Sequence, residues 1–227
     1  MNENKILEIF NNQIKNTVNV RDTDYKQRIQ KIESIIDWIY LNRDLIKESL
    51  HKDFSKPDLE TDITEIWVTI DLAKNVIRNL KKWMQAKKVP ASLSVFLASS
   101  YIEYYPKGVC LIIAPWNYPF QLCMSPLIYS IAAGNCTIIK PSEITSNTSK
   151  LVSRMITELF EENEVSVIEG GQDEAKILLK KPFNHIFFTG SDKIGEKIVE
   201  ASSKHLSSIT LELGGKSPVI IDKGYNL

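Results

Sequence analysis

The stretch KGVCLIIAPWNYPFQLCMSPLIYSIAAGNCTIIKPSE, residues 107–143, constrains the fold more than any other part of the sequence. Two short runs in it, 109–114 and 136–139, are apolar without alternation, as expected for strands covered on both faces. Between them, Ser125 and Pro126 are typical of the first positions of a helix. The pattern predicts a βαβ crossover. Because open parallel sheets bind ligands beyond the carboxyl ends of their strands, the loops after the two runs are the expected site.

The remainder of the second half repeats the alternation of strand, loop and helix. An amphipathic segment after Glu143, with a cap at Thr145 or Ser146, predicts a crossover helix. Further strands are expected at residues 165–169, 185–189, 208–212 and 218–221, with helices at 174–180 and 194–205. Repeated units of this kind predict an α/β fold, a doubly wound parallel sheet of nucleotide-binding type.

An all-helical segment is expected to precede the sheet, because the apolar residues from 1 to about 88 recur at spacings of three and four. The three sets are Ile6, Ile9, Phe10 and Ile14; Ile29, Ile32, Ile36 and Ile39; and Ile63, Ile66, Ile70, Ile77, Leu80 and Met84. A break is expected at residues 51–62, which contain Pro57. These helices are interpreted as packing against the sheet. Residues 95–105 are rich in β-branched and aromatic side chains, which predicts a strand.

Composition excludes several classes of protein. The chain has 227 residues, 43% hydrophobic and 25% charged, which is ordinary for a soluble globular protein. The chain has 28 basic residues (Lys and Arg) and 28 acidic residues (Asp and Glu). The formal net charge is therefore zero, and no excess positive charge would attract nucleic acid or an anionic membrane. The three cysteines follow neither a disulfide nor a metal-ligand spacing, which favours a reducing cytoplasm and no metal site. No secretory leader or membrane span is expected, since no run approaches ~20 apolar residues.

Four short motifs of polar residues and glycines follow one another along the chain. They contain Asn117 in PWNYPF, Lys140 and Glu143 in KPSE, Gly190 and Ser191 in FTGS, and Glu212 in LELGGKSP. From about Thr61 to the end, the sequence resembles the aldehyde dehydrogenase superfamily. The tracts TDITEIWVTIDLAKNVIRNLKKWM and PFNHIFFTGS are more similar to its class 3 branch, which acts on fatty and aromatic aldehydes, than to the larger tetrameric one.

The resemblance implies an organisation into three segments. Residues 1–90 would be the helical segment packing on the cofactor domain, 91–106 a strand segment of an oligomerisation element, and 107–227 the NAD(P)-binding domain. The catalytic domain would lie outside this chain. The implied substrate is a small-molecule aldehyde, the implied cofactor is NAD, with NADP as the alternative, and the full-length protein would be a cytoplasmic homodimer.

The cofactor residues that the resemblance implies are Trp116, Lys140, Glu143, Gly170, Gly171, Gly190, Ser191, Leu213 and Gly214. The fingerprint GxGxxG is absent. A strand end followed by a small residue and a helix N-terminus can nevertheless hold a pyrophosphate, because the free N–H groups and the helix dipole favour an anion. Taken alone, Gly190 and Ser191 could equally form a tight turn with a helix cap. Trp116 could equally be core packing.

By the same resemblance, Lys140 and Glu143 would hold the adenosine ribose. A carboxylate at the 2′-hydroxyl repels a 2′-phosphate, which favours NAD over NADP. The alternative interpretation of KPSE in isolation is an exposed, salt-bridged turn.

Two residues are the catalytic candidates. Asn117 offers a neutral amide donor that can stabilise developing charge on an oxygen, although an Asn in a Pro-rich loop is also a common turn residue. Glu212 ends an apolar strand, where burial would raise the pKa of a carboxyl group and suit it as a base. In the resembled enzymes this glutamate activates the water that hydrolyses a thioester. Without the motif match, a solvent-exposed carboxylate would be the better interpretation.

The nucleophilic cysteine that such enzymes need is not expected in this chain. Cys110, Cys123 and Cys136 are each explained as small buried side chains, and none stands in the family's nucleophile motif. The first hypothesis is therefore the amino-terminal part of an aldehyde dehydrogenase, inert by itself. The second is a non-catalytic cofactor- or partner-binding remnant, or half of a split enzyme. The third is a CoA-acylating or phosphate-ester-reducing relative, against which Glu212 argues because acylation of CoA needs no water-activating base.

Overall fold

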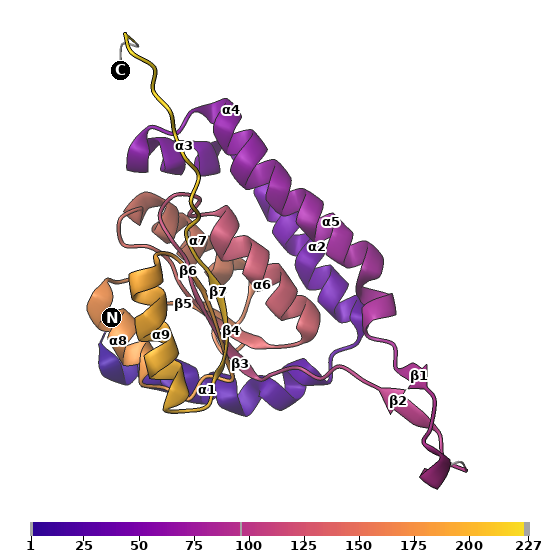
Figure 1. Cartoon of the computed structure of the whole chain (residues 1–227). Coiled ribbons are helices and arrows are strands. Elements are labelled where there is room, and N and C mark those ends of the chain that lie inside the picture. Colours follow the sequence, from indigo (N-terminus) through magenta and orange to yellow (C-terminus); the bar gives the residue numbers. More distant parts are fainter. Residues whose placement is uncertain (1, 96, 225–227) are drawn as a thin grey trace.

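The computed structural model describes residues 2–95 and 97–224. Its centre is a parallel sheet with helices on both faces, and a small two-stranded arm projects from one end of the molecule (Figure 1). The strands of the sheet are β3 (Val109–Ile113), β4 (Cys136–Lys140), β5 (Val165–Val167), β6 (His185–Thr189) and β7 (Ser208–Glu212). Their order is β5-β4-β3-β6-β7, and each adjacent pair is parallel. The predicted doubly wound parallel sheet is confirmed.

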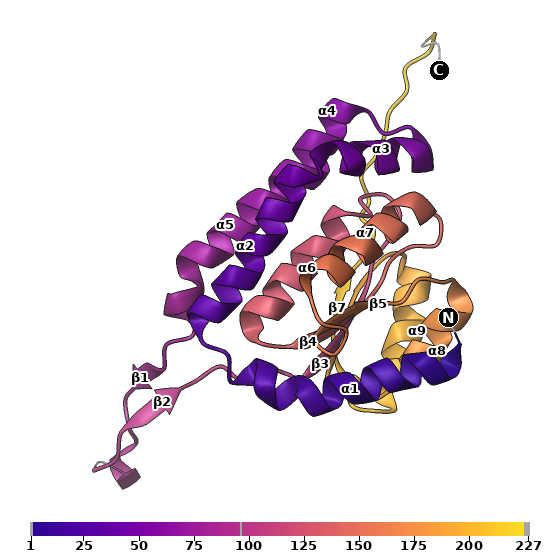
Figure 2. The same ribbon diagram turned by 180° about the vertical axis from the view of Figure 1, so that it is seen from behind.

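The described chain has helices on both faces of the sheet and a short 3-10 helix in the projecting arm (Figure 1). They are α1 (Glu3–Arg21), α2 (Tyr25–Leu41), α3 (Arg43–Phe54), α4 (Asp58–Thr61), the π-helix η1 (Asp62–Trp67), α5 (Val68–Trp83), the short 3-10 helix η2 (Leu93–Val95), α6 (Gln121–Ala133), α7 (Ser146–Leu159), α8 (Gln172–Leu179) and α9 (Asp192–Ser203). Helices α6 and α7 cover one face, with α2 and α5 packed outside them. Helices α1, α8 and α9 cover the other, and Figure 2 shows α1 running beneath β3 and β4.

A hydrophobic core lies on each face of the sheet, and alternate residues of the central strands pack into one core or the other. Leu111 and Ile138 pack with α1, α8 and α9, whereas Ile112 and Ile139 pack with α2, α5, α6 and α7. The chain runs outward from β3 to β5 in one direction and then from β6 to β7 in the other. This reversal places the topological switch point between β3 and β6, which is where open α/β sheets bind ligands.

Helix α6 does not begin where the sequence predicts. It starts at Gln121, so Pro126 lies inside the helix, and the expected start at Ser125 and Pro126 is wrong. The reason is tertiary: a carboxylate oxygen of Glu65, on η1, accepts a hydrogen bond from the Gln121 backbone N–H at 2.8 Å. That distant carboxylate accepts one of the N–H groups that a helix beginning at Gln121 leaves free, so it stabilises a start one turn before Pro126.

Helix α7 is capped in a similar way. Its N-cap is Thr145, as expected, but the Thr145 side chain makes no capping bond. Instead the carboxylate of Asp53, from the end of α3, accepts bonds from the backbone N–H groups of Asn147 at 2.9 Å and Thr148 at 2.8 Å. The two contacts tie α3 to the start of α7, beside the carboxyl ends of the strands.

The segment around residue 90 differs from the prediction. The helical segment ends at Trp83, and β1 (Lys87–Val89) follows it and pairs antiparallel with β2 (Ser100–Ile102). The strand expected at residues 95–105 is thus only three residues long, and Phe96 within it lies outside the described residues. The expected break at 51–62 is shorter too, because α3 continues to Phe54.

The strand expected at residues 218–221 is not formed. Those residues make no ladder in the described chain, and Val219 and Ile220 are 84% and 93% exposed. Figure 1 shows this segment leaving the sheet beyond β7. No described strand lies beyond β7 to pair with it, so its backbone groups have no ladder to join.

Of the apolar helical sets, Ile14, Ile63 and Met84 are exposed, while most other members are in the two cores. Within residues 2–95 and 97–224, none of the helices combines the length and the apolar composition needed to cross a lipid bilayer.

Candidate functional site

A cavity of about 640 Å³ opens at the carboxyl ends of β3, β4, β6 and β7. This volume lies within the ordinary range for small-molecule and cofactor sites. Of the residues proposed from the sequence, those that line it are Trp116, Asn117, Lys140, Glu143, Gly171, Gly190, Ser191, Glu212, Leu213 and Gly214. Gly170 does not line it. The switch point between β3 and β6 thus brings four separate motifs to one place.

At the end of β4, Lys140 and Glu143 form a pair. The Lys140 side chain is buried and donates to Glu143 Oε2 at 3.0 Å and to the Pro141 carbonyl at 2.9 Å. Burial raises the pKa of Glu143, but its own backbone N–H and Lys140 more than offset this, so the pKa lies below its ordinary value. The salt-bridged turn expected as the alternative therefore exists, with the Lys140 side chain buried and the Glu143 side chain 47% exposed at the cavity.

The loop after β6 presents polar groups to the same cavity. Ser191 is the N-cap of α9 in extended conformation, and its hydroxyl makes no capping bond. Because the first amides of a helix have no intrahelical partner, the start of α9 leaves free N–H groups beside Ser191. Thr189 also lines the cavity, and its buried hydroxyl oxygen has no hydrogen-bond partner among the described residues. These donors suit a ligand that carries anionic or hydroxyl oxygens.

Glycines give this end of the cavity its shape. A Cβ at Gly190 would lie 2.4 Å from the Phe188 ring, so only glycine fits over that side chain. A Cβ at Gly195, in α9, would lie 3.0 Å from Leu213, so Gly195 leaves room for the Leu213 side chain. Gly214 has open space around it. Its backbone can therefore be approached closely by a flat ring.

Asn117 lies in the loop that follows β3 and is exposed. Its side-chain oxygen accepts a bond from the Tyr118 backbone N–H at 3.1 Å, while its amide nitrogen donates to no protein atom in the part of the chain that the structure describes. Its neighbour Trp116 is half exposed and meets the Phe54 ring edge-on at 6.5 Å between centroids. Trp116 is therefore not a core residue, and the alternative interpretation of it as core packing is wrong.

Glu212 is exposed, which contradicts the burial expected for it. The physical reason is its position: it ends β7, the edge strand, and no described strand covers that edge. Its carbonyl oxygen accepts a bond from the Gly190 N–H at 3.0 Å, so the ends of β6 and β7 are held together.

The three cysteines are buried and none lines this cavity. Burial raises the pKa of Cys110 to about 11 and that of Cys136 to about 12, and it raises the pKa of the fully buried Cys123 still further. Since the thiolate is the nucleophile, none of them is reactive near neutral pH.

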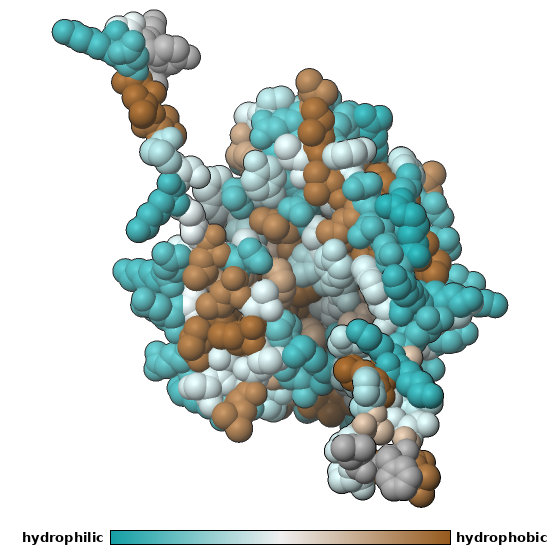
Figure 3. All heavy atoms as spheres, turned by 45° about the vertical axis from the view of Figure 1, so that its right-hand side comes forward, coloured by the Kyte–Doolittle hydropathy of each residue, from teal (hydrophilic) through white to brown (hydrophobic). Residues whose placement is uncertain are grey.

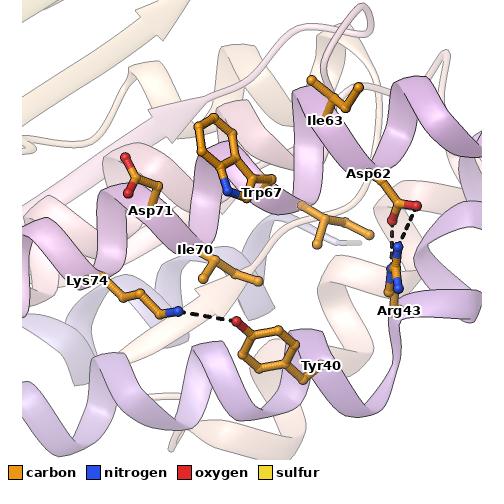
Figure 4. A pocket seen from close by; sticks show the side chains of 9 residues that line it. Tyr40, Arg43, Asp62, Ile63, Trp67, Ile70, Asp71 and Lys74 are labelled. Atoms are coloured by element: carbon orange, nitrogen blue, oxygen red, sulfur yellow. Dashed lines mark hydrogen bonds and ion pairs between the residues drawn. The ribbon is translucent and has the colours of Figure 1, made fainter.

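A second cavity of about 440 Å³ lies between α2 and the helix formed by η1 and α5 (Figure 4). The Arg43 guanidinium pairs with the Asp62 carboxylate at 2.7 Å, and Lys74 Nζ donates to the Tyr40 hydroxyl at 3.3 Å. None of the residues proposed from the sequence lines it. Among the described residues, no cluster of His, Cys, Asp and Glu could hold a metal ion.

Comparison with known proteins identifies the family. Residues 2–227 match the model of the aldehyde dehydrogenase family. The chain is 44% identical to the putative aldehyde dehydrogenase AldX of Bacillus subtilis, over 98% of this chain and 50% of that protein. It is 43% identical to the 4,4′-diaponeurosporen-aldehyde dehydrogenase of Staphylococcus aureus, over 93% and 46%, and 39% identical to mouse aldehyde dehydrogenase family 3 member B2, over 91% and 43%. The chain belongs to the aldehyde dehydrogenase family.

Solved structures agree with this assignment. The substrate-bound state of Staphylococcus aureus AldH superposes with a TM-score of 0.91 at 41% identity, over 96% of this chain and 48% of that one. The NAD⁺ complex of Mycobacterium tuberculosis aldehyde dehydrogenase has a TM-score of 0.79 at 23% identity, over 87% and 40%, and shows the shared fold alone. The chain spans about half the length of the relatives it matches, which agrees with the expectation of an amino-terminal portion.

Two features of the site were not predicted from the sequence. Thr189 directly precedes Gly190 at a strand end, so its position alone could have drawn attention to it. Lys56 and Glu65 lie behind the Asn117 loop, where Lys56 Nζ is 4.0 Å from the centre of the Tyr118 ring. They carry no local signal, because they come from a helical region more than 50 residues earlier in the sequence.

Proposed function

We propose that this chain is the cofactor-binding part of an NAD(P)-dependent aldehyde dehydrogenase that oxidises a small-molecule aldehyde to a carboxylate. The observation that supports it most is the single cavity lined by residues of all four motifs. We further propose NAD as the preferred cofactor. Residues 1–90 would support the cofactor domain of residues 107–227, with 91–106 in an oligomerisation element.

The adenosine end of the cofactor would lie against β4. Lys140 and Glu143 would bind the ribose hydroxyls, since together they offer a donor and an ionised acceptor at the cavity wall. The lowered pKa of Glu143 keeps its carboxylate ionised near neutral pH, and this charge would repel a 2′-phosphate. Gly171 lines the same part of the cavity, beside Glu143.

The pyrophosphate would lie at the start of α9. The Ser191 hydroxyl, the first free amides of α9 and the unpartnered Thr189 hydroxyl are the donors that would hold it. Asp192, at the first position of the helix, carries a negative charge close to that place. The pyrophosphate would therefore approach the Gly190–Ser191 side of the loop.

At the reacting end, a nicotinamide cofactor would take a hydride from the substrate carbon. The free amide nitrogen of Asn117 would donate to the substrate oxygen as charge develops on it, and removal of one such donor costs on the order of 10² to 10³ in rate. Glu212 would take a proton from the water that hydrolyses the acyl-enzyme. The attacking cysteine would come from the half of the relatives' length that this chain does not span.

The arm formed by β1 and β2 would contribute to a homodimer. A two-stranded ribbon is marginal by itself, and this one projects away from the body of the molecule (Figures 1 and 2). A second copy of the protein would supply the surface that stabilises it.

Two kinetic experiments test the proposal. The purified 227-residue chain should form no NADH from NAD and an aldehyde, because all three thiols are buried. Turnover abolished by Cys123→Ser would contradict this. In the enzyme completed with the remaining half, Glu212→Gln should retain a rapid burst of NADH and then turn over slowly, since only deacylation needs activated water. Equal loss of burst and steady state would assign Glu212 another role.

A further inference from the structure

A buried ion pair lies directly behind the Asn117 loop. Lys56 Nζ is 2.6 Å from Glu65 Oε1, and the two side chains are only 2% and 0% exposed. Lys56 follows α3, where Ser55 turns the chain in the left-handed conformation, and Glu65 belongs to the π-helix η1. Neither residue lines the cavity.

The pair contacts the loop at Tyr118 and at its junction with α6. Lys56 Nζ lies over the ring of Tyr118, the residue after Asn117, at 4.0 Å from the ring centre. The second oxygen of Glu65 accepts from the backbone N–H of Gln121, the first residue of α6, at 2.8 Å. One pair of opposite charges therefore holds both the middle of the loop and the helix into which it runs.

The Asn117 side chain has little else to fix it. Its only hydrogen bond within the described ranges is the local one from the Tyr118 N–H. The direction in which its free amide nitrogen points thus depends on the backbone of Asn117 and Tyr118. Lys56 contacts the Tyr118 ring, Glu65 caps the helix that follows, and the Tyr118 carbonyl accepts from the Leu122 N–H at 2.9 Å.

Hydrophobic packing alone does not account for this pair. Two buried ions lose their hydration, and an apolar pair of similar size is often as stable or more stable. A π-helical turn is also a less regular backbone than a plain α-helix and is frequent at functional sites. The pair offers what an apolar pair lacks, a carboxylate that caps α6 and a cation that rests on Tyr118.

We propose that Lys56 and Glu65 are positioning residues that hold the Asn117 loop so that the Asn117 amide faces the cavity. Their effect on the reaction rests on the proposed function, whereas their effect on the loop does not. Both effects can be measured separately.

The first measurement uses ¹⁹F NMR of the 227-residue chain labelled with 5-fluorotryptophan. Trp116 precedes Asn117, and its resonance can be identified with Trp116→Phe. Glu65→Gln should shift the Trp116 resonance by more than its linewidth. The control is Asp62→Asn, which removes the Asp62 carboxylate on the same π-helix (Figure 4), where it pairs with Arg43 and Lys47. It should leave Trp116 unmoved.

A double variant separates positioning from stability. Lys56→Met/Glu65→Leu removes both buried charges, so its urea midpoint should exceed that of Glu65→Gln and the variant should fold even if Glu65→Gln does not, although the cap of α6 is lost. In this double variant the Gln121 N–H has lost its acceptor and Tyr118 has lost its cation, so the Trp116 resonance should still differ from that of the unaltered chain. A double variant with the Trp116 resonance at its original position would overturn the proposal.

The second measurement is kinetic, in the completed enzyme. Glu65→Gln should lower kcat about 10- to 100-fold and change the dissociation constant of NAD less than about twofold. In an Asn117→Ala background, Glu65→Gln should cause no further loss beyond about twofold, because it acts through Asn117. The same full loss in both backgrounds would overturn the proposal. If the completed enzyme oxidises no aldehyde, the proposed function fails, and the ¹⁹F result alone still decides the positioning role.

Discussion

The two sides of the sheet differ in how completely they are covered. Every residue of β4 is buried, as are four of the five residues of β3, whereas no residue of β7 is buried. Strands β3 and β4 lie between α6 on one face and α1 on the other. Strand β7 is an edge strand that contacts α9 on one face.

This difference divides the candidate site. Lys140 and Glu143 lie at the end of β4, on the covered side, while Glu212 and Gly214 lie at and beyond the end of β7. Figure 3 shows the chain beyond β7 standing away from the body of the molecule. Within the described residues, the strand that carries the proposed adenosine end is therefore more buried than the strand that carries the proposed reacting end.

The largest expected contrast is in stability. Ile138, fully buried in β4, is expected to cost about 3 to 4 kcal/mol of unfolding free energy when changed to Ala, because a cavity replaces a packed side chain. Leu211→Ala in β7 should cost about 1 kcal/mol, since that side chain is only partly buried. Urea denaturation would measure both. Equal costs would mean that the two sides are covered alike.

A second contrast uses two cations. Arg28 is buried and donates to the Ala132 and Arg21 carbonyls and to the Thr23 hydroxyl, so it joins α2 to the end of α6. Arg28→Met should cost about 2 to 3 kcal/mol, because carbonyls bonded to a cation lose their partner. Lys107, exposed and bonded to Ser208 at the start of β7, is the matched control. Lys107→Met should change stability by less than about 0.5 kcal/mol; a larger cost than that of Arg28→Met would reverse the comparison.

The thiols of the covered side give a smaller, pH-dependent contrast. Burial raises the pKa of Cys110 in β3 from 9.0 to about 11, so the folded state prefers the neutral thiol. The stability that the neutral Cys110 thiol contributes to the folded state is fully present below pH 9. It is lost as the pH rises through about 11, because the thiol of the unfolded chain ionises first. The loss from this thiol should be roughly 1 kcal/mol at pH 10. Cys110→Ala should flatten the profile above pH 9, and an unchanged slope would show that this thiol ionises freely in the folded protein.

The sheet could be predicted from the sequence because its determinants are local. The runs that became β3, β4 and β6 are short and apolar, and each ends in a polar or glycine-containing loop. Since parallel strands place their carboxyl ends at one edge, the order of the motifs was enough to bring Asn117, Lys140 and Gly190 together.

Three of the errors have a common physical cause, which is dependence on distant groups. The start of α6 is set by Glu65, 56 residues away in the sequence, and no helix rule applied to residues 121–126 could reveal it. The burial of Glu212 and the strand at 218–221 both require a neighbour beyond β7, and the described chain places none there. The sequence pattern shows that a strand can form, but not what lies next to it.

The central claim is that the cavity binds a dinucleotide with its adenosine ribose on Lys140 and Glu143. Titration calorimetry of the folded chain with NAD and with NADP tests it directly, with dissociation constants for NAD expected in the roughly millimolar range, about −4 kcal/mol. Glu162, which pairs with Lys5 and lies before β5 at the opposite end of the sheet, supplies the control variant Glu162→Ala. It should leave both affinities unchanged.

Glu143→Ala should weaken NAD and spare or improve NADP, because it removes an acceptor for the 2′-hydroxyl and the charge that repels a 2′-phosphate. The account predicts that the ratio of NAD to NADP affinity falls about fivefold, or about 1 kcal/mol. A ratio that is the same in Glu143→Ala, Glu162→Ala and the unaltered chain would contradict it and remove Glu143 from the cofactor site.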